Sequence, residues 1–389
     1  MSDSPRHGDL VGPVTVGPVA HGGHCVARLD GRVIFVRHAL PGEVVHVRLT
    51  DVSKPRLWRG DAVEVLVASP ERVTPRCPIA GPGLCGGCDW QHATLPTQRE
   101  LKRSVVAEQL SRLAGMEWSG AVEAVDGPVP EGYGWRTRMR YLADRGRVGM
   151  RAHRSHDLVE LPDSGCAISA SLAPLPPDDF IGEIAVAGSG SDVSVIAEGD
   201  LVVGPAIRTE RAAGRTYEVA ADGFWQVHPE AADTLVAAVL DGVAPRAGER
   251  GLDLYCGVGL FAGALADRGV TVHGVESWAP AIDLARTNVR EAAFTASRVD
   301  RYLPRHRGSV DIVVLDPPRT GAGADVVNHI VRLEPRVVAY VACDPAALAR
   351  DLATFAQSGY EPTSIRAFDL FPQTHHVECV AVVQPRASA

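Results

Sequence analysis

The feature that most constrains this chain is a regular alternation of apolar strand-like runs and helix-like stretches after about residue 230. The predicted strands lie near 251–255, 270–276, 310–315, 337–342 and 377–383, and the predicted helices lie near 230–241, 259–268, 279–293 and 345–357. Such alternation is typical of an α/β fold, in which helices cover both faces of a mainly parallel sheet. Because ligands bind at the carboxyl ends of the strands in these sheets, residues directly after each strand are the first candidates for a site.

The first two of these strand ends favour an adenosyl cofactor. LDLYCGVGLF, from residue 252, joins an apolar strand to a helix through a turn whose glycines allow the backbone to approach a ligand. The next strand ends at Glu276, 23 residues after Asp253, where a carboxylate can accept hydrogen bonds from ribose hydroxyls. The alternative is an ordinary turn beside a surface carboxylate.

Two further strands bring reactive side chains to the same predicted edge. The strand in VDIVVLDPPRTG (310–321) ends at Asp316, and the strand in VVAYVACDPAALARDL (337–352) ends at Cys343, just before a helix that starts with proline. A helix N-terminus is expected to lower the pKa of a thiol and to favour the thiolate. Taken alone, Cys343 would be a buried core thiol, but its position, which matches that of Asp316, favours a nucleophile.

Glu378 begins the last apolar strand, in HHVECVAVV (375–383). A carboxylate is out of place there unless it lies at the mouth of the strand. If that mouth opens into the same pocket, Glu378 can act as a general base. The alternative is a charge on an edge strand.

Four cysteines have the spacing of a metal site. Cys77, Cys85 and Cys88 form a C-x7-C-x2-C cluster in a glycine-rich segment, and Cys166 follows far downstream. The pattern fits an iron–sulfur cluster or a structural zinc ion. Free structural thiols are the alternative.

The N-terminal part has the pattern of a small barrel and the middle carries a basic hairpin. Short valine-rich strands separated by glycine turns fill residues 10–68, as in barrels of the OB type, for which RNA binding and other roles stay open. The predicted hairpin at 135–161 holds seven arginines, which favours contact with phosphates. Since the net charge of the whole chain is −8, nucleic acid would have to bind at such local patches.

No apolar stretch approaches the 18 residues that a membrane span requires, and the N-terminus lacks the pattern of a signal peptide. We therefore expect a cytoplasmic protein that does not bind membranes.

Taken in this order, the segments resemble the bacterial RNA uracil-5-methyltransferase family over about residues 10–384. Residues 10–68 are similar to the TRAM domain that begins many members, and CPIAGPGLCGGCDWQH (77–92) resembles the family's cluster-binding loop. The segments similar to the family's methyltransferase motifs are FWQVHPEA, DLYCGVGLF, LDPPRTG, YVACDPAALARDL and HHVECVAVV.

The resemblance implies a class I, Rossmann-like α/β methyltransferase domain, an N-terminal OB-like TRAM barrel and a small central α+β domain that carries a metal cluster. The expected barrel covers residues 1–70 and binds RNA. The expected central domain joins 71–92 with 119–220, and the S-adenosylmethionine-dependent domain joins 93–118 with 221–389.

The resemblance also implies roles for single residues. Cys343 would be the nucleophile and Glu378 the base. The residues that would line the site for S-adenosylmethionine are Gln226, Asp253, Tyr255, Gly257, Glu276 and Asp316. The ligands of a 4Fe–4S cluster, with zinc as the alternative, would be Cys77, Cys85, Cys88 and Cys166.

The expected reaction is methylation of C5 of a uracil through a covalent bond between Cys343 and C6. The base would leave its stack to reach the pocket. The expected substrate is structured RNA, with 23S rRNA favoured and the T-loop of tRNA second, and the expected enzyme is a monomer.

Three other functions remain as alternatives. An amino-group methyltransferase commonly has an aromatic residue after its Pro-Pro pair, whereas Arg319 follows here. A cytosine-5 enzyme usually has its cysteine directly after a proline, whereas Pro345 follows Cys343. A non-catalytic RNA-binding protein with a redox-sensing cluster would not need Cys343, Glu378 and Asp316.

Overall fold

The structure is a computed structural model that describes residues 5–128 and 131–386. The chain forms two compact units. Unit 1 comprises Met1–Val105, Pro128–Ala185 and Phe371–His376, and unit 2 comprises Val106–Gly127, Val186–Leu370 and Val377–Ala389. Within the described part of the chain, the structure contains no helix that is long and apolar enough to cross a membrane. The domain boundaries expected from the sequence stay a prediction.

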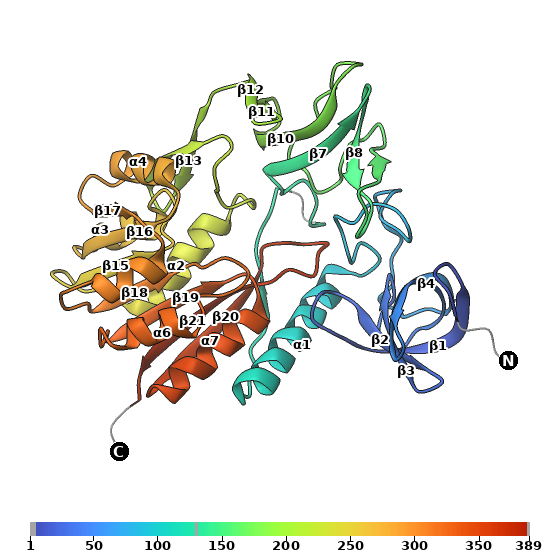
Figure 1. The fold of residues 1–389 in the computed structure, drawn as a ribbon, viewed down its shortest axis with the longest axis horizontal. Coiled ribbons are helices and arrows are strands. Elements are labelled where there is room, and N and C mark those ends of the chain that lie inside the picture. The colour runs from blue at the N-terminus through green and yellow to red at the C-terminus, as the bar shows by residue number, and fades with distance from the viewer. Residues whose placement is uncertain (1–4, 129–130, 387–389) are drawn as a thin grey trace. The chain divides into compact units, whose positions relative to one another are not determined.

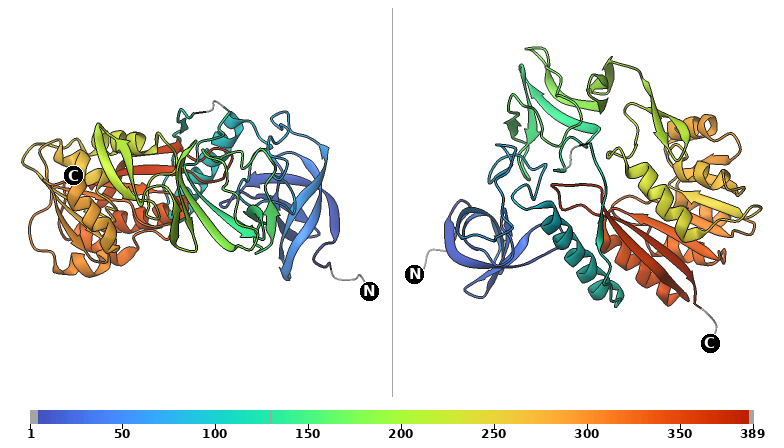
Figure 2. Two further views of the ribbon diagram at one scale, coloured as in Figure 1. Left: turned by 90° about the horizontal axis from the view of Figure 1, so that it is seen from above. Right: turned by 180° about the vertical axis from the view of Figure 1, so that it is seen from behind.

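The N-terminal part of unit 1 is a closed five-stranded barrel, coloured blue in Figures 1 and 2. Its strands are β1 (Leu10–Val19), β2 (Cys25–Leu29), β3 (Arg32–Arg37), β4 (Val44–Lys54) and β5 (Leu57–Val67). They follow the order β1-β2-β3-β5-β4, and β1 closes the barrel by pairing antiparallel with β4. Inward-facing residues such as Ile34 and Val45 are fully buried, because side chains alternate across each strand. The predicted small barrel is confirmed.

Within unit 1, a glycine-rich segment with three cysteines lies after the barrel. An antiparallel hairpin lies later in the chain. The hairpin consists of β7 (Arg138–Asp144) and β8 (Arg147–Arg151), and β9 (Leu158–Glu160) pairs with β8. Arg145 and Gly146 both have positive φ, as a tight two-residue hairpin turn requires. The hairpin predicted around residues 144–146 is therefore confirmed.

The proline-rich and glycine- and serine-rich pieces within residues 173–192 predict surface loops, and this prediction is wrong for part of the segment. β10 (Ile181–Ser189) is a strand in which Ile184 and Val186 are buried. Their alternation is a strand signal, but glycines within the same segment weakened it. Two further hairpins follow, β11 (Asp192–Ala197) with β12 (Asp200–Val203), and β13 (Ile207–Ala212) with β14 (Arg215–Ala220).

Unit 2 is built on an eight-stranded sheet in the order β17-β16-β15-β18-β19-β21-β20-β6. The strands are β6 (Val122–Ala124), β15 (Arg250–Leu254), β16 (Thr271–Glu276), β17 (Ala293–Ala296), β18 (Ile312–Leu315), β19 (Val337–Ala342), β20 (Tyr360–Asp369) and β21 (Glu378–Pro385). The first five strands in this order are parallel, and β21 runs antiparallel to both β19 and β20. The predicted α/β fold is confirmed.

Helices cover both faces of this sheet (Figure 1). They are α2 (Ala231–Val243), α3 (Leu260–Ala266), α4 (Ala279–Asn288), α5 (Val299–Tyr302), α6 (Ala324–Val331) and α7 (Pro345–Gln357), with a short 3-10 helix at Leu303–Arg305. The long helix α1 (Leu95–Ala114) begins in unit 1, and its residues from Val106 onward belong to unit 2. The central strands are buried along their whole length, so polar side chains can reach solvent only beyond the strand ends.

Candidate functional site

Cys343 and Glu378 occupy opposed positions at the end of the antiparallel pair β19–β21. Ala342 faces Cys379 in the register of the two strands, so the next position along pairs Cys343 with Glu378. Opposed residues in antiparallel strands point to the same face, with Cβ atoms about 4.5–5.5 Å apart. Glu378 is almost fully buried, whereas Cys343 is half-buried and can reach the surface. The structure thus brings together the two residues that the sequence places 35 positions apart.

Asp316 lies at the same edge of the sheet. It directly follows β18, the parallel neighbour of β19, and its backbone N donates a hydrogen bond to the carbonyl of Leu254, the last residue of β15. Its charge acts on both Cys343 and Glu378. One thiol and two carboxyl groups therefore share one end of the sheet.

Burial and mutual repulsion disfavour the charged forms of all three groups. Burial, followed by the charges of Glu378 and Asp316, raises the pKa of Cys343 to about 12. Burial raises the pKa of Asp316 to about 7. Burial and then the charge of Asp316 raise the pKa of Glu378 well above its ordinary value. The group is short of positive charge, and a cationic ligand would relieve that shortage.

The prediction that the following helix lowers the pKa of Cys343 is therefore wrong for this structure. Asp344 is the N-cap of α7, and its Oδ1 accepts a hydrogen bond of 2.8 Å from the N–H of Ala347. The cap itself satisfies a free N–H group at the helix start and adds a negative charge beside the thiol. Burial and carboxylates outweigh the helix dipole at this position.

Arg319 is a functional candidate that the sequence reasoning used only to argue against another enzyme class. Its charge lowers the pKa of both Cys343 and Glu378, in opposition to burial. It lies in the loop after β18, three residues beyond Asp316. A cation three residues after Asp316, in the same strand-end segment, was the available sequence signal.

The loop that carries Arg319 is fastened at its far end by Asp351 of α7. The carboxylate of Asp351 accepts hydrogen bonds from the N–H groups of Ala322 (2.8 Å) and Gly323 (3.2 Å) and from the hydroxyl of Tyr340 (2.6 Å). Asp351 is almost fully buried, so these donors depend on it. The loop that carries Arg319 is thereby fixed to the helix that follows Cys343.

The residues expected to bind the cofactor lie around the first two strand ends of the sheet. Tyr255 and Gly257 both have positive φ in the turn after β15. Asp253 is fully buried, and its Oδ2 accepts a hydrogen bond of 2.8 Å from the N–H of Ala262 in α3. Its Oδ1 has no hydrogen-bond partner, and burial raises its pKa to about 8. This carboxyl therefore holds the turn, and it adds to the shortage of positive charge.

Glu276 ends β16, and its carboxylate accepts hydrogen bonds of 2.9 Å from the Ser277 hydroxyl and the Trp278 N–H. Gln226 is buried in the segment between β14 and α2. A Cβ added to Gly223 in that segment would lie 3.0 Å from Cζ3 of Trp278, so the indole packs closely against this backbone. The structure thus brings the Gln226 segment beside the end of β16.

Two aromatic residues near this segment were missed by the sequence reasoning. Phe224 is 67% exposed and Trp278 is 39% exposed. Large exposed aromatic side chains beside a ligand site are typical of surfaces that stack on bases or nucleosides. Their positions, two residues before Gln226 and two residues after Glu276, were the available signal.

The four spaced cysteines line one cavity of unit 1. The cavity-lining residues include Cys77, Cys85, Cys88, Cys166, Arg136 and Met150. Burial raises the pKa of Cys85 to about 11 and also raises the pKa values of Cys88 and Cys166. Between residues 5 and 386, apart from 129–130, no group of three or more His, Cys, Asp or Glu residues is arranged to hold a metal ion. The metal cluster therefore stays a prediction.

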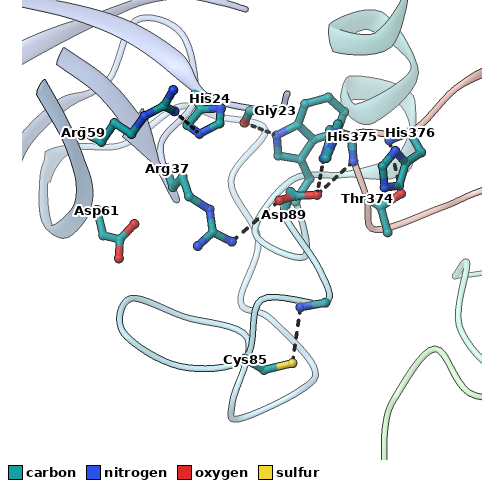
Figure 3. A network of polar contacts seen from close by, with 12 residues as sticks. Gly23, His24, Arg37, Arg59, Asp61, Cys85, Asp89, Thr374, His375 and His376 are labelled. Atoms are coloured by element: carbon teal, nitrogen blue, oxygen red, sulfur yellow. Dashed lines mark hydrogen bonds and ion pairs between the residues drawn. The ribbon is translucent and has the colours of Figure 1, made fainter. Parts of the chain in front are cut away.

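The Cys85–Cys88 segment is held against the hairpin by its backbone. Cys85 forms a β-bridge with Ala152, and the N–H of Gly86 donates a hydrogen bond of 3.1 Å to the carbonyl of Arg151. A Cβ on Gly86 would lie 2.9 Å from the Cα of His153, so only glycine fits without a shift. The N–H of Gly87 donates to the sulfur of Cys85 (3.4 Å; Figure 3).

The arginine-rich hairpin is less free for phosphate contact than its sequence indicates. Arg140 and Arg151 both pair with Glu183, at 2.5 Å and 3.8 Å, and Arg147 pairs with Asp144. Glu183 lies on β10, the strand that the sequence reasoning missed, and so its charge was not counted.

Comparisons with known families agree with this architecture. Residues 11–67 match the TRAM domain, residues 229–340 match the methyltransferase small domain, and residues 303–386 match the tRNA (uracil-5-)-methyltransferase family. The last match contains Asp316, Cys343 and Glu378.

Similar proteins cover nearly the whole chain. An uncharacterized RNA methyltransferase of Streptomyces avermitilis is 49% identical over 96% of this chain and 98% of its own length. The 23S rRNA (uracil(1939)-C(5))-methyltransferase RlmD of a Shewanella species is 30% identical over 95% of each chain. The crystal structure of the Pyrococcus abyssi tRNA (uracil-54, C5)-methyltransferase in complex with S-adenosyl-L-homocysteine is 26% identical, with a TM-score of 0.71, over 95% of this chain and 99% of its own.

Proposed function

Because the chain belongs to the TRAM-containing, S-adenosylmethionine-dependent RNA uracil-5-methyltransferase family, we propose that it methylates C5 of one uridine in 23S rRNA, with Cys343 as nucleophile and Glu378 as base. The observation that carries this proposal is the cross-strand pairing of the half-buried Cys343 with the buried Glu378. A nucleophile and a base that serve the same ring must be held within reach of neighbouring carbons, and opposed strand positions meet that requirement.

The Cys343 thiolate attacks C6 of the uracil, so that an S–C6 bond forms and C5 becomes an enolate-like carbon. S-adenosylmethionine, when bound, supplies an electrophilic methyl group to that carbon. Glu378 then takes the proton from C5, the electron pair restores the C5–C6 double bond, and the S–C6 bond breaks. The charge of Arg319 opposes the raised pKa values of Cys343 and Glu378, and so favours the thiolate and the ionised base that these two steps use.

The residues around the first strand ends fit an adenosyl sulfonium ligand. Glu276 offers a carboxylate to ribose hydroxyls, and the positive-φ turn at Tyr255 and Gly257 leaves room for close approach. The raised pKa values of Asp253 and Asp316 favour a cation nearby. Gln226, Asp253, Tyr255, Gly257, Glu276 and Asp316 would hold the cofactor.

We also propose that the four cysteines of unit 1 bind a 4Fe–4S cluster. Their buried sulfurs line one cavity, and burial makes unliganded thiolates there unfavourable. A tetrahedral zinc ion would need sulfurs about 3.8 Å apart, because Zn–S bonds are about 2.3 Å long. Zinc at the same four sulfurs is the alternative.

Contacts with RNA are best supported where the barrel meets the end of the hairpin within unit 1. Burial and then the charges of Arg59 and Arg37 lower the pKa of His24 to about 4. The charge of Arg154 also lowers the pKa values of both His24 and Arg59. This concentration of positive charge in an acidic protein fits a phosphate backbone.

The test is to map 5-methyluridine in ribosomal and transfer RNA from cells that lack this gene. Loss of one modified position in 23S rRNA, restored by the wild-type gene, supports the proposal. Loss in the T-loop of tRNA would overturn the choice of substrate but not the reaction. With purified components, the Glu378→Gln variant should accumulate a covalent RNA–protein adduct that survives denaturing electrophoresis, and Cys343→Ala should form none.

A further inference from the structure

The strand that begins with Glu378 is preceded by six residues that belong to the other unit. Phe371–His376, called here the anchor loop, is part of unit 1, whereas Leu370 before it and Val377 after it belong to unit 2. Val377 is buried in the core of unit 2 and directly precedes Glu378. The proposed base is thus separated by a single residue from a segment held in unit 1.

The anchor loop is bound by the residue that directly follows Cys88. The Oδ2 of Asp89 accepts hydrogen bonds from Nδ1 of His375 (2.6 Å) and from the His375 backbone N–H (3.2 Å), as Figure 3 shows. The N–H groups of Asp89 and Trp90 both donate to the carbonyl of Gln373, at 3.0 Å and 3.1 Å. Three chain-adjacent residues, Cys88 to Trp90, therefore join the cysteine site to the anchor loop.

Helix α1 holds the same loop from another direction. The side-chain amide of Gln98 exchanges two hydrogen bonds with Gln373, at 2.8 Å and 3.0 Å, and Nζ of Lys102 donates to the carbonyl of Phe371 (3.0 Å). Gln98 and Lys102 are fully buried. These contacts fix the beginning of the loop, and the Asp89–His375 pair holds it three residues before Glu378.

Residues of the barrel also contact the Asp89–His375 pair. Arg37 of β3 lies 3.6 Å from Oδ1 of Asp89, and both side chains are largely buried. A Cβ added to Gly23 would lie 2.7 Å from the Cβ of His375, so the ring of His375 is confined against the barrel backbone. A hydrogen bond to a buried, paired carboxylate in a confined setting positions a side chain more firmly than a surface contact does.

We propose that Asp89 and His375 are positioning residues, through which the cysteine site controls how Glu378 removes the C5 proton. With the cysteine segment ordered around its cluster, Asp89 holds His375 and thereby the start of β21. When that segment loosens, attack by Cys343 and methylation continue, but C5–H removal and release of RNA slow down. The inference rests on the proposed function and adds a regulator to the same site.

The test measures covalent adduct and proton release separately, with uridine tritiated at C5 in the RNA. The Asp89→Ala holoenzyme should release tritium about ten- to a hundredfold more slowly in a single turnover, as expected for loss of a hydrogen bond to a charged group. RNA adduct should accumulate in parallel. Asp89→Asn, which keeps an acceptor for His375, should restore most of the release rate.

A matched control exists in the barrel. His46 Nδ1 and Glu64 Oε2 form a hydrogen bond of 2.7 Å with the same chemistry, but the pair is exposed and lies outside the anchor loop. Glu64→Ala should therefore leave tritium release and adduct unchanged. Cofactor binding by calorimetry and far-UV circular dichroism check that each variant is folded.

A loss of activity in Asp89→Ala without adduct would overturn the proposal, because a merely destabilised enzyme slows every step. Wild-type protein stripped of its iron should also accumulate adduct, and a stripped enzyme that does not would overturn it as well. Glu378→Gln, assayed alongside, separates this failure from that of the proposed function. If adduct accumulates in the Glu378→Gln variant but not in the Asp89→Ala variant, only this inference is contradicted. If neither variant accumulates adduct and the Cys343→Ala variant is active, the proposed function is contradicted as well.

Discussion

Unit 2 gathers Asp316, Cys343 and Glu378 at one edge of its sheet, called here the strand-end site, and unit 1 gathers four cysteines around a cavity. Both sites collect polar groups from distant positions in the chain, but they are assembled in different ways. In unit 2, Asp316, Cys343 and Glu378 each lie at the end of a strand, and the register of one sheet brings them together. In unit 1, the cysteines lie in loops, and isolated contacts such as the Cys85–Ala152 bridge hold them.

The difference has consequences for charge and for tolerance to mutation. The strand-end site buries and crowds acidic groups at the end of a sheet, which raises the pKa values of its reactive groups. The cavity depends on close approach of backbone to backbone, as at Gly86. We therefore expect changes in the strand-end site to alter chemistry more than stability, and changes at the cavity to alter stability first.

The largest expected effect in the strand-end site is that of Cys343→Ala. Removal of the nucleophile should lower the rate of methylation by at least about a thousandfold, because the covalent route is lost. The melting temperature should stay close to that of the wild type, since the side chain is only half-buried. Methyl transfer is measured with radiolabelled S-adenosylmethionine, and an active variant would contradict the mechanism.

The burial and crowded carboxyl groups of the strand-end site predict a distinctive pH dependence for Cys343. A thiol whose pKa is raised to about 12 stays protonated at neutral pH, and its thiolate fraction grows as the pH rises towards that pKa. Alkylation of Cys343 by iodoacetamide should thus rise about tenfold per pH unit between about pH 7 and about pH 10.

Glu378→Gln removes one of the charges that raise this pKa and should speed alkylation at every pH in that range. Mass spectrometry of the Cys343 peptide follows the reaction in both proteins. A plateau near the ordinary pKa of a thiol in the wild type would show that the strand-end site is less crowded than the structure indicates.

At the cavity, two neighbouring glycines give a matched pair. Gly86→Ala should destabilise the protein by about 2–3 kcal/mol, because the new Cβ meets the backbone of His153. Gly87→Ala should cost less than about 1 kcal/mol, because its Cβ would lie 3.5 Å from the Cys85 sulfur, an ordinary contact. Thermal unfolding measures the stability of both variants. Equal losses of stability would contradict the inference that this site depends on close approach of the backbone at Gly86.

An effect smaller than that of Gly86→Ala is expected where the strand-end site depends on a buried anchor. Asp351→Asn weakens the acceptor of the Ala322, Gly323 and Tyr340 donors and should cost about 1–2 kcal/mol of stability. The exposed Asp283→Asn is the control and should change stability little. If Asp351→Asn is as stable as the control, the loop that carries Arg319 is held by other contacts.

Sequence reasoning predicted the closed barrel, the hairpin and the α/β fold because each rests on local periodicity and turn residues. It failed at β10, where glycines within the strand weakened the alternation. It also overestimated the free charge of the hairpin, because Glu183 reaches Arg140 only once β10 is a strand. The strand-edge positions of Asp316 and Cys343 were predictable, since the carboxyl ends of parallel strands meet at one edge.

The sequence by itself determined which side chains stand at strand ends, because strand periodicity and chain order are local properties. Only the tertiary structure decided that Glu378 faces Cys343, since β21 enters the sheet antiparallel between β19 and β20 and its register depends on distant partners. The same holds for the raised pKa of Cys343 and for the contact between Asp89 and His375. Burial and long-range hydrogen bonds within the chain arise from the packing of segments far apart in sequence, which no local pattern encodes.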